Sequence, residues 1–380
     1  MQSNLWFPVK PEFPKLEKNI SCDVAVIGAG IAGISCAYFL QEKGFDVAVI
    51  EKDEIGSAAT GASSGILFQG SGEELNETIE LMGEKKTRVL WDETRESIEG
   101  IKKITEAEGI ECDLRKTGSV NVALNEGQAE QLRKEAEAHE KFGLKAEFLE
   151  GKELENFFSL KEFPAGLKND YCFQVRPAHF ALGLAEKNNM KIFQQTEMLE
   201  IESTEHGVKV KTNGGTIDAK KAVITTNLRP FFGLEKYFKM ENSAIIAGQK
   251  MPEEKLNEIF PENAIVWTQG ANYDILYPRD ERIALEVYEL RTAKEKIPQY
   301  FPGIEFRKEI VFGDSWAKTN DTLPLIGKVK ENIFAAIAMG DQGIVMGFTA
   351  GRKIASALEG KKDSFLEMCS PERFSASNNG

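Results

Sequence analysis

The apolar and polar positions at the start of the chain predict a βαβ unit. Residues 22–27 are small or branched apolar groups, typical of a buried parallel strand. Residues 31–43 predict a helix that Gly44 closes, and residues 46–51 predict the next strand. The uncharged run from Val24 to Leu40 is interrupted by glycines, so it predicts strand, turn and helix rather than a membrane span.

Further along the chain the pattern changes from helical to extended. Residues 73–108 predict a helix broken near Gly83, and residues 126–142 predict another helix. Residues 191–225 predict short strands, and the period-two alternation over residues 243–318 predicts an antiparallel sheet.

The C-terminal part returns to the pattern of the N-terminal part, with an apolar strand at 332–339 and a helix at 343–358. We therefore expect a mixed α/β and α+β fold, in which a Rossmann-like domain contains an inserted antiparallel-sheet domain. The expected Rossmann-like domain comprises residues 1–83, 151–227 and 315–380, and the inserted domain comprises residues 84–150 and 228–314.

Composition narrows the classes of function. The chain of 380 residues has 60 acidic and 47 basic residues, a net charge of -13, which disfavours binding to nucleic acid or to an anionic membrane. The N-terminus lacks the apolar segment of a signal peptide. Five scattered cysteines show no metal-ligand spacing and fit a reducing cytoplasm, so no metal site is expected.

The first turn of the chain carries a dinucleotide-binding pattern. Gly28 makes a tight turn after the strand, Gly30 lets the backbone approach a pyrophosphate, and Gly33 lets the helix pack on the strand. Glu51, at the end of the next strand, can accept hydrogen bonds from ribose hydroxyls. An acid at this position disfavours NADP, and the motif leaves FAD and NAD open.

Four stretches give the chain a resemblance to a known family. It resembles the FAD-dependent D-amino-acid-oxidase-like superfamily, which includes glycine, sarcosine and gamma-glutamylputrescine oxidases. Its two ends look closest to a subgroup that often carries a C-terminal Rieske domain. The stretches are "DVAVIGAGIAGISCAYFLQEKGFDVAVIEKDEIGSAATGASSG", "KAVITTN", "DTLPLIG" and "ENIFAAIAMGDQGIVMGFTAGRKIASALEGK".

This resemblance implies that FAD lies extended across the Rossmann-like domain. The flavin ring would lie near the loop of residues 61–65 and face the N-terminus of the last helix, whose dipole would stabilise negative charge on the reduced ring. The implied cofactor-binding residues are Gly28, Gly30, Gly33, Glu51, Lys52, Gly61, Ala62, Ser63, Ser64, Gly340, Asp341, Gln342, Gly343 and Ile344.

The sequence also departs from the family. None of the three histidines neighbours a cysteine in the manner of a Rieske ligand pair, so no Rieske centre is expected. No cysteine falls where the sarcosine oxidases attach flavin, so we expect non-covalent FAD. Gln342 stands where the family usually has a histidine.

The family's substrate-carboxylate arginine has no counterpart on its usual strand, where Lys318 is the base. Lysine can pair with a carboxylate without the bidentate fork of arginine. Arg176, Arg279 and Arg282 are other candidates, each alternatively a structural or solvated cation.

Between the flavin and the antiparallel sheet, the resemblance implies a substrate pocket. We expect Tyr273, Tyr277, Trp316 and Lys318 to line it and serve catalysis, and the two tyrosines could instead be sheet packing. The implied reaction is oxidation of a C–N bond of an amine or amino acid by hydride transfer to flavin N5. Electrons then pass to oxygen or to an electron-acceptor protein. The alternatives are a non-catalytic FAD-binding subunit or assembly factor, and an NAD-dependent dehydrogenase.

Overall fold

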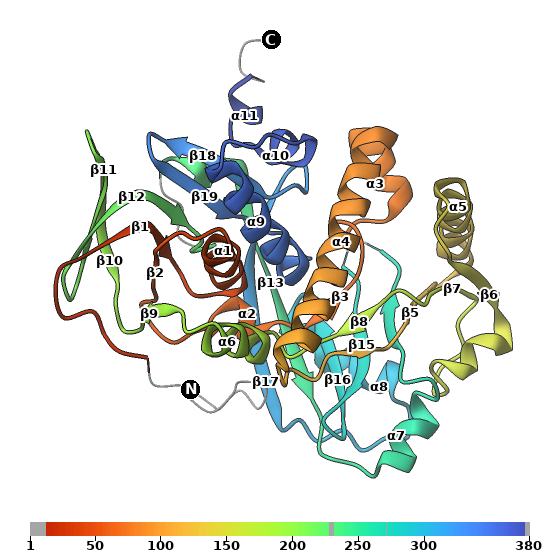
Figure 1. Ribbon diagram of the computed structural model, residues 1–380. Helices are drawn as coiled ribbons and strands as arrows, with labels where there is room; N and C mark the ends of the chain where they lie inside the picture. The colour runs from red at the N-terminus through yellow and green to blue at the C-terminus, as the bar shows by residue number, and fades with distance from the viewer. Residues whose placement is uncertain (1–12, 228–231, 271, 377–380) are drawn as a thin grey trace.

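The fold is built around two eight-stranded sheets (Figure 1). A computed structural model describes residues 13–227, 232–270 and 272–376. The parts of the expected domains at 1–12, 228–231 and 377–380 lie outside the described residues.

The first sheet has a parallel centre. Strand β1 (Ile20–Ile27) lies between β2 (Val47–Ile50) and β12 (Thr216–Ile224), parallel to both. Strand β19 (Ile333–Ile337) returns from the C-terminal part of the chain and pairs in parallel with β12. The sheet is completed by β9 (Lys191–Phe193), β10 (Met198–Thr204), β11 (Gly207–Thr212) and β18 (Leu325–Lys330).

Both faces of β1 are buried over its last four residues, 24–27, which explains why this part of the strand is continuously apolar. Val24 and Val26 belong to the core under the helices, whereas Ala25 and Ile27 belong to the core on the opposite face. Alternate residues of a strand point to opposite faces, so one strand supplies two cores.

Helices α1 (Ile31–Glu42) and α9 (Gly343–Leu358) pack against each other beside the first sheet (Figure 1). Glycines on α9 permit this close approach. A Cβ on Gly347 would lie 2.7 Å from Cγ2 of Ile31, and one on Gly351 would lie 2.5 Å from the backbone nitrogen of Cys36. Helix α9 therefore has a fixed position relative to the glycine-rich turn that precedes α1.

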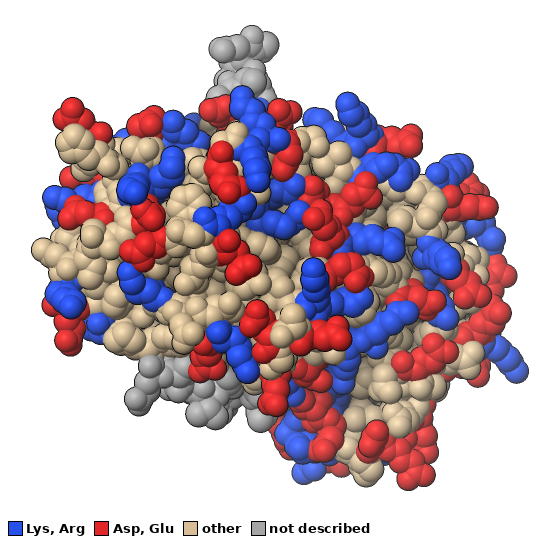
Figure 2. Space-filling model, viewed as in Figure 1, with Lys and Arg blue, Asp and Glu red and all other residues tan. Residues whose placement is uncertain are grey.

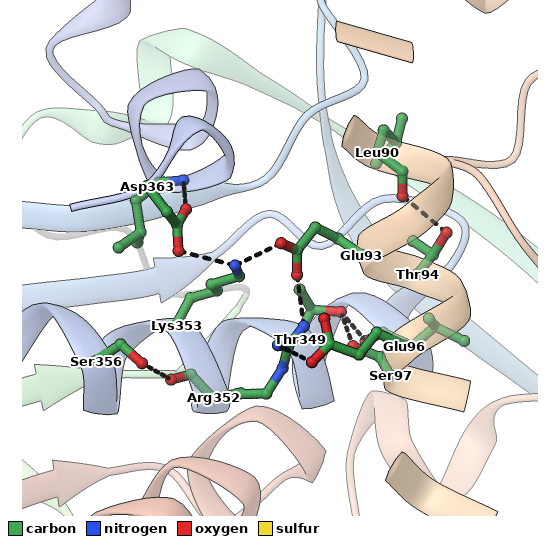
Figure 3. Close-up of polar contacts among 12 residues, drawn as sticks. Leu90, Glu93, Thr94, Glu96, Ser97, Thr349, Arg352, Lys353, Ser356 and Asp363 are labelled. Atoms are coloured by element: carbon green, nitrogen blue, oxygen red, sulfur yellow. Dashed lines mark hydrogen bonds and ion pairs between the residues drawn. The ribbon is translucent and has the colours of Figure 1, made fainter. Parts of the chain in front are cut away.

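A polar network holds α9 against α4 (Glu84–Glu108), as Figure 3 shows. Lys353 Nζ lies 2.6 Å from Oε1 of Glu93 and 2.8 Å from Oδ2 of Asp363, at the start of α10 (Ser364–Cys369). Nearby, the hydroxyls of Ser97 and Thr349 are 2.7 Å apart. These contacts give the buried lysine two carboxylate partners and stabilise the position of α9.

The second sheet is antiparallel except for one parallel pair, β14 with β5. Its core is closed by α7 (Glu253–Ile259) and α8 (Ala293–Tyr300). Its strands, in spatial order, are β17 (Ile310–Thr319), β13 (Phe238–Ala247), β16 (Arg282–Val287), β15 (Ile275–Arg279), β14 (Ile265–Thr268), β5 (Ser119–Val122), β7 (Ala165–Asn169) and β6 (Glu147–Glu150).

The remaining helices and short strands complete the fold. A three-stranded sheet forms from β3, β8 and β4, and α5 packs on β7. These elements are α2 (Ala59–Ala62), β3 (Ile66–Leu67), α3 (Leu75–Met82), β4 (Arg115–Lys116), α5 (Glu126–Phe142), β8 (Phe173–Gln174), α6 (Pro177–Lys187) and α11 (Arg373–Ala376).

The expected fold class is confirmed: a Rossmann-like α/β part is combined with an antiparallel sheet. The expected helix break at Gly83 falls between α3 and α4, where this glycine has φ +81°. The domain boundaries stay a prediction. The two sheets do not follow the expected boundaries at every point. Strand β7 (Ala165–Asn169) lies in the second sheet although residues 151–227 were expected in the Rossmann-like domain, and β17 (Ile310–Thr319) spans the expected boundary at residue 315.

Acidic and basic side chains are intermixed over the face shown in Figure 2, without a large area of one sign. Within the described residues, no helix is both long and apolar enough to cross a membrane.

Candidate functional site

The glycine-rich turn follows β1 and lines part of a large cavity. Gly28 has φ +107°, a conformation that favours glycine, and Gly28 and Gly30 line the cavity. Gly33 does not line it. A Cβ on Gly33 would lie 1.9 Å from the carbonyl oxygen of Gly28, so this glycine serves the packing of α1 on the turn.

Glu51 closes the same region from the end of β2. Its Oε2 accepts a hydrogen bond from the Ala29 N–H at 2.9 Å, and its Oε1 accepts one from the Asp53 N–H at 3.0 Å. Burial raises the pKa of Glu51, and these two N–H donors act in the opposite direction. Each carboxylate oxygen retains acceptor capacity for a ligand hydroxyl.

The cavity has a volume of about 480 Å³ and is lined by residues of both sheets. Of the fourteen expected cofactor residues, all except Gly33, Gly61 and Ala62 line it. Gly61 and Ala62 lie in the short helix α2, whose Thr60 lines the cavity and accepts a hydrogen bond from the Ile31 N–H at 3.0 Å.

The N-terminus of α9 lines the cavity through Gly343 and Ile344. Gly340 has φ +66° and turns the chain from β19 into α9, and Gln342 is the N-cap residue. Oε1 of Gln342 accepts a hydrogen bond from the Phe68 N–H at 3.4 Å. A helix N-terminus carries partial positive charge, which suits an anionic ligand group.

Asp341 precedes this N-terminus and is held by two side chains of β17. Trp316 donates its Nε1–H to Oδ1 at 2.7 Å, and Lys318 Nζ lies 2.7 Å from Oδ2. Lys318 Nζ also lies 2.6 Å from Oε1 of Glu73. Burial alone would lower the pKa of Lys318, but the two carboxylates outweigh it and the pKa is raised.

The residues at the N-termini of α1 and α9 leave room for an extended dinucleotide. A Cβ on Gly30 would meet only Oγ1 of Thr60, at 3.1 Å, and a Cβ on Gly343 would meet no atom within 4 Å. Both glycines line the cavity, so side chains there would occupy space that the native sequence leaves open. Gly30, Glu51 and the start of α9 could hold the pyrophosphate, a ribose and the flavin ring of FAD.

The four expected substrate residues separate into two pairs. Tyr273 and Trp316 line the cavity, whereas Tyr277 and Lys318 do not. Tyr277 is fully buried in an apolar cluster between the sheets, which covers its ring. Lys318 is directed to Asp341 and Glu73, so the expectation that it lines the pocket does not match its position.

The three candidate arginines also have protein partners and do not line the cavity. Arg176 pairs with Asp280 and Asp113, and Arg282 pairs with Glu309. Arg279 donates to the carbonyl oxygens of Ser64 and Val175 at 3.0 and 3.2 Å, which supports the loop beside the expected flavin position.

Several cavity residues on the second sheet were not anticipated from the sequence. Glu286 and Tyr288 come from β16 and the residue just after it, and Trp267 comes from β14. Phe68, just after β3, packs edge-to-face on Trp267 with ring centroids 4.7 Å apart. An acid inside the apolar strand "RIALEV" was the available signal for Glu286.

A profile of the family described as FAD dependent oxidoreductase matches residues 23–357 of this chain. The chain therefore belongs to the FAD-dependent oxidoreductases. Within the described residues, no group of three or more His, Cys, Asp or Glu side chains could hold a metal ion.

Curated relatives and a solved structure are similar to this chain over most of its length. The gamma-glutamylputrescine oxidoreductase of Escherichia coli is 26% identical over 377 residues, covering 93% of this chain and 87% of that protein. The putative Rieske 2Fe-2S iron-sulfur protein YhfW of Bacillus subtilis is 22% identical over 392 residues, covering 96% of this chain and 74% of that protein. The structure of glycine oxidase from Bacillus cereus has a TM-score of 0.73 at 20% identity, covering 91% of this chain and 97% of that one, and shows the same fold.

Proposed function

We propose that this chain holds FAD non-covalently along the cavity and oxidises a C–N bond of an amine or amino acid. The observation that carries the proposal is one cavity lined by the glycine-rich turn, by Glu51, by the start of α9 and by aromatic side chains of the second sheet. Two relatives support the choice of reaction, because their names specify a gamma-glutamylated amine and glycine.

The adenosine diphosphate half of FAD would lie at Gly28, Gly30 and Glu51, and the ring system at Ser63, Ser64 and the start of α9. When bound, FAD supplies the electron-pair acceptor of the reaction. Non-covalent attachment is supported by the lining residues, since no cysteine or histidine lines the cavity in the described part of the chain.

The protein's own contribution is positioning and exclusion of water. Trp267, Tyr273, Tyr288 and Trp316 would enclose the substrate's reacting carbon on the side opposite the cofactor. Burial raises the pKa of Tyr273 and Tyr288, so both hydroxyls stay neutral at physiological pH. No acid–base side chain is obligatory for this reaction, provided that the amine nitrogen is neutral when the C–N bond is oxidised.

We propose oxygen as the electron acceptor, with a separate acceptor protein as the alternative. With oxygen, the reaction consumes the amine, oxygen and water, and it yields a carbonyl compound, ammonia or a smaller amine, and hydrogen peroxide. Reoxidation of the reduced protein by air within seconds in a stopped-flow cell would support oxygen. A reduced form that persists in air for minutes would favour a protein acceptor.

Two measurements on the purified protein test the proposal. Acid precipitation should release FAD into the supernatant, and a panel of amines and amino acids should include one that yields hydrogen peroxide and a carbonyl product in equal amounts. A colourless protein that binds NAD on titration would contradict cofactor and reaction together. Flavin that stays with the acid precipitate would contradict the non-covalent attachment.

A further inference from the structure

Two acidic residues lie in the part of the cavity that is lined by aromatic side chains, and Glu286 is the one without a basic partner in the described part of the chain. The other acid there, Asp341, has Trp316 and Lys318 as partners. Glu286 accepts a hydrogen bond from the Ser243 hydroxyl to Oε1 at 2.7 Å, and the Ser64 hydroxyl also acts on its carboxyl group. Within the described residues, its buried Oε2 has no partner at ordinary hydrogen-bond distance and no basic side chain pairs with it.

The backbone of β16 fixes Glu286 between two neighbouring strands. It pairs with Ile245 of β13 on one side and with Ile275 of β15 on the other. Its side chain is enclosed by protein except at the cavity, where part of its surface is accessible. The residue's accessible surface lies on the cavity, so a ligand there is the partner that the carboxylate can meet.

Burial raises the pKa of Glu286, while the hydroxyls of Ser243 and Ser64 act in the opposite direction. A buried carboxylate whose donors are neutral hydroxyls is unfavourable unless a cation or further donors reach it. A carboxylate can accept about four hydrogen bonds, so two hydroxyls leave part of its acceptor capacity unused.

Aromatic rings adjoin Glu286 in the same part of the cavity. The rings of Tyr273 and Tyr288 are 5.4 Å apart edge-to-face, and Tyr288 and Trp316 are 6.0 Å apart. Trp267 and Phe68 also line the cavity. Aromatic faces attract an organic cation, most strongly when water is excluded, and do not attract an anion in the same way.

Apart from the N-terminus of α9, where the flavin ring would lie, the cavity offers little to a carboxylate. Among the described residues, Lys52 is the one basic side chain that lines it, and Lys52 follows Glu51 at the glycine-rich turn. Lys318 is paired with Asp341 and Glu73, and Arg279 donates to two backbone carbonyls. A substrate carboxylate beside Glu286 would thus meet a like charge without a cation to offset it.

We propose that Glu286 and the surrounding aromatic rings bind the ammonium group of an organic cation, so that the substrates are amines without a carboxylate next to the reacting carbon. This inference rests on the proposed function for the statement that the bound cation is the substrate, whose nitrogen must first release its proton, to the carboxylate of Glu286 or to water, before the C–N bond is oxidised. The binding itself follows from the acid, the rings and the absence of a lining cation in this part of the described cavity.

The inference is tested by measuring how the purified holoprotein binds three compounds that share one apolar group and differ in charge. The compounds are tert-butylammonium, tert-butanol and pivalate, which place a positive, a neutral and a negative group on the same apolar body. Tert-butylamine has no hydrogen on its α-carbon, so it cannot be oxidised there and its binding is independent of turnover. Calorimetry and perturbation of the flavin absorbance give the dissociation constants.

We expect tert-butylammonium to bind about tenfold or more tightly than tert-butanol or pivalate, because a charge-assisted contact in a desolvated site has this magnitude. Glu286→Gln should weaken tert-butylammonium by about tenfold or more and leave tert-butanol nearly unchanged. Glu289→Gln removes a carboxylate that pairs with Arg291 on the surface, and this matched control should bind like the wild type.

Pivalate binding as tightly as tert-butylammonium would overturn the inference, as would a Glu286→Gln protein that binds the cation within about threefold of the wild type. Absence of measurable cation binding would overturn it too. If Glu286→Gln does not fold, as judged by flavin content and circular dichroism, the charge series on the wild type decides. A protein that binds the cation through Glu286 but oxidises no amine would contradict the proposed function and leave the binding inference standing.

Discussion

Lys318 Nζ lies 2.7 Å from Oδ2 of Asp341, and this contact joins β17 to the residue just before the N-cap of α9. Trp316 reaches the other oxygen of the same carboxylate, and Glu73 gives Lys318 a second anionic partner. The group fixes the start of α9 at the cavity. Lys318 is therefore a positioning residue for this helix.

Lys318→Met should destabilise the protein, because it leaves the carboxylates of Asp341 and Glu73 without a cation in a mostly buried place. The free energy of unfolding should fall by about 2–3 kcal/mol, somewhat below the range for a fully buried pair because Lys318 is 21% exposed. Urea unfolding monitored by circular dichroism measures the change.

Lys328→Met is the matched control, since Lys328 pairs with Glu331 on the surface and should contribute about 0.5 kcal/mol or less. Equal stability of the two variants would contradict the structural role given to Lys318.

The second and third glycines of the turn should fail in different ways when replaced. A Cβ on Gly33 would lie 1.9 Å from the Gly28 carbonyl oxygen, so Gly33→Val should prevent folding of the first sheet. Gly30→Val meets only Oγ1 of Thr60, at 3.1 Å, and should fold but not retain FAD, because its side chain occupies the cavity. Flavin-to-protein ratio and circular dichroism measure the two effects.

Full flavin content in folded Gly30→Val would show that the pyrophosphate does not lie at this turn. Soluble, folded Gly33→Val with native stability would contradict the packing role of Gly33.

These glycines also show how far the sequence could be interpreted. Gly28, Gly30 and Gly33 lie within six residues, so their spacing together with the apolar runs on either side predicts strand, turn and helix. The partners of Lys318 come from the residue before the N-cap of α9 and from the segment before α3, and side-chain pairing across such distances in the sequence follows from tertiary packing. Glu286 was missed for the same reason, since the sequence shows an acidic residue in a strand but not which side chains donate hydrogen bonds to it.

Tyr277 illustrates a second limit of prediction from the sequence, which is the depth of burial. Alternation along a strand correctly groups residues by face, but it does not say how deeply each is covered. Tyr273, before β15, reaches the cavity, whereas Tyr277 within β15 is covered by the cluster that includes Ile66 and Ile245.

Glu74 should make stability depend on pH. Burial and the neighbouring Glu135 raise the pKa of Glu74 above its ordinary value of 4.5. The folded protein therefore binds more protons than the unfolded chain just above this pH, and stability falls as pH rises through that window. Glu74→Gln keeps an acceptor for Asn121 and removes the charge, so it should flatten this fall and stabilise the protein near neutral pH by on the order of 1 kcal/mol.

Thermal unfolding at a series of pH values above 4.5 measures the effect, with Glu80→Gln, an exposed change on α3, as the control. A Glu74→Gln protein less stable than the wild type near neutral pH would show that the ionised carboxylate contributes favourably, against this account.

Anaerobic addition of amines and amino acids to the yellow protein, followed by its absorbance spectrum, tests the central claim most directly. The account predicts that at least one amine without a carboxylate beside its reacting carbon bleaches the visible flavin bands, and that the bands return on admission of air. Flavin bands that stay unchanged with every amine and amino acid in the panel, at full flavin loading, would contradict the claim that this chain oxidises C–N bonds.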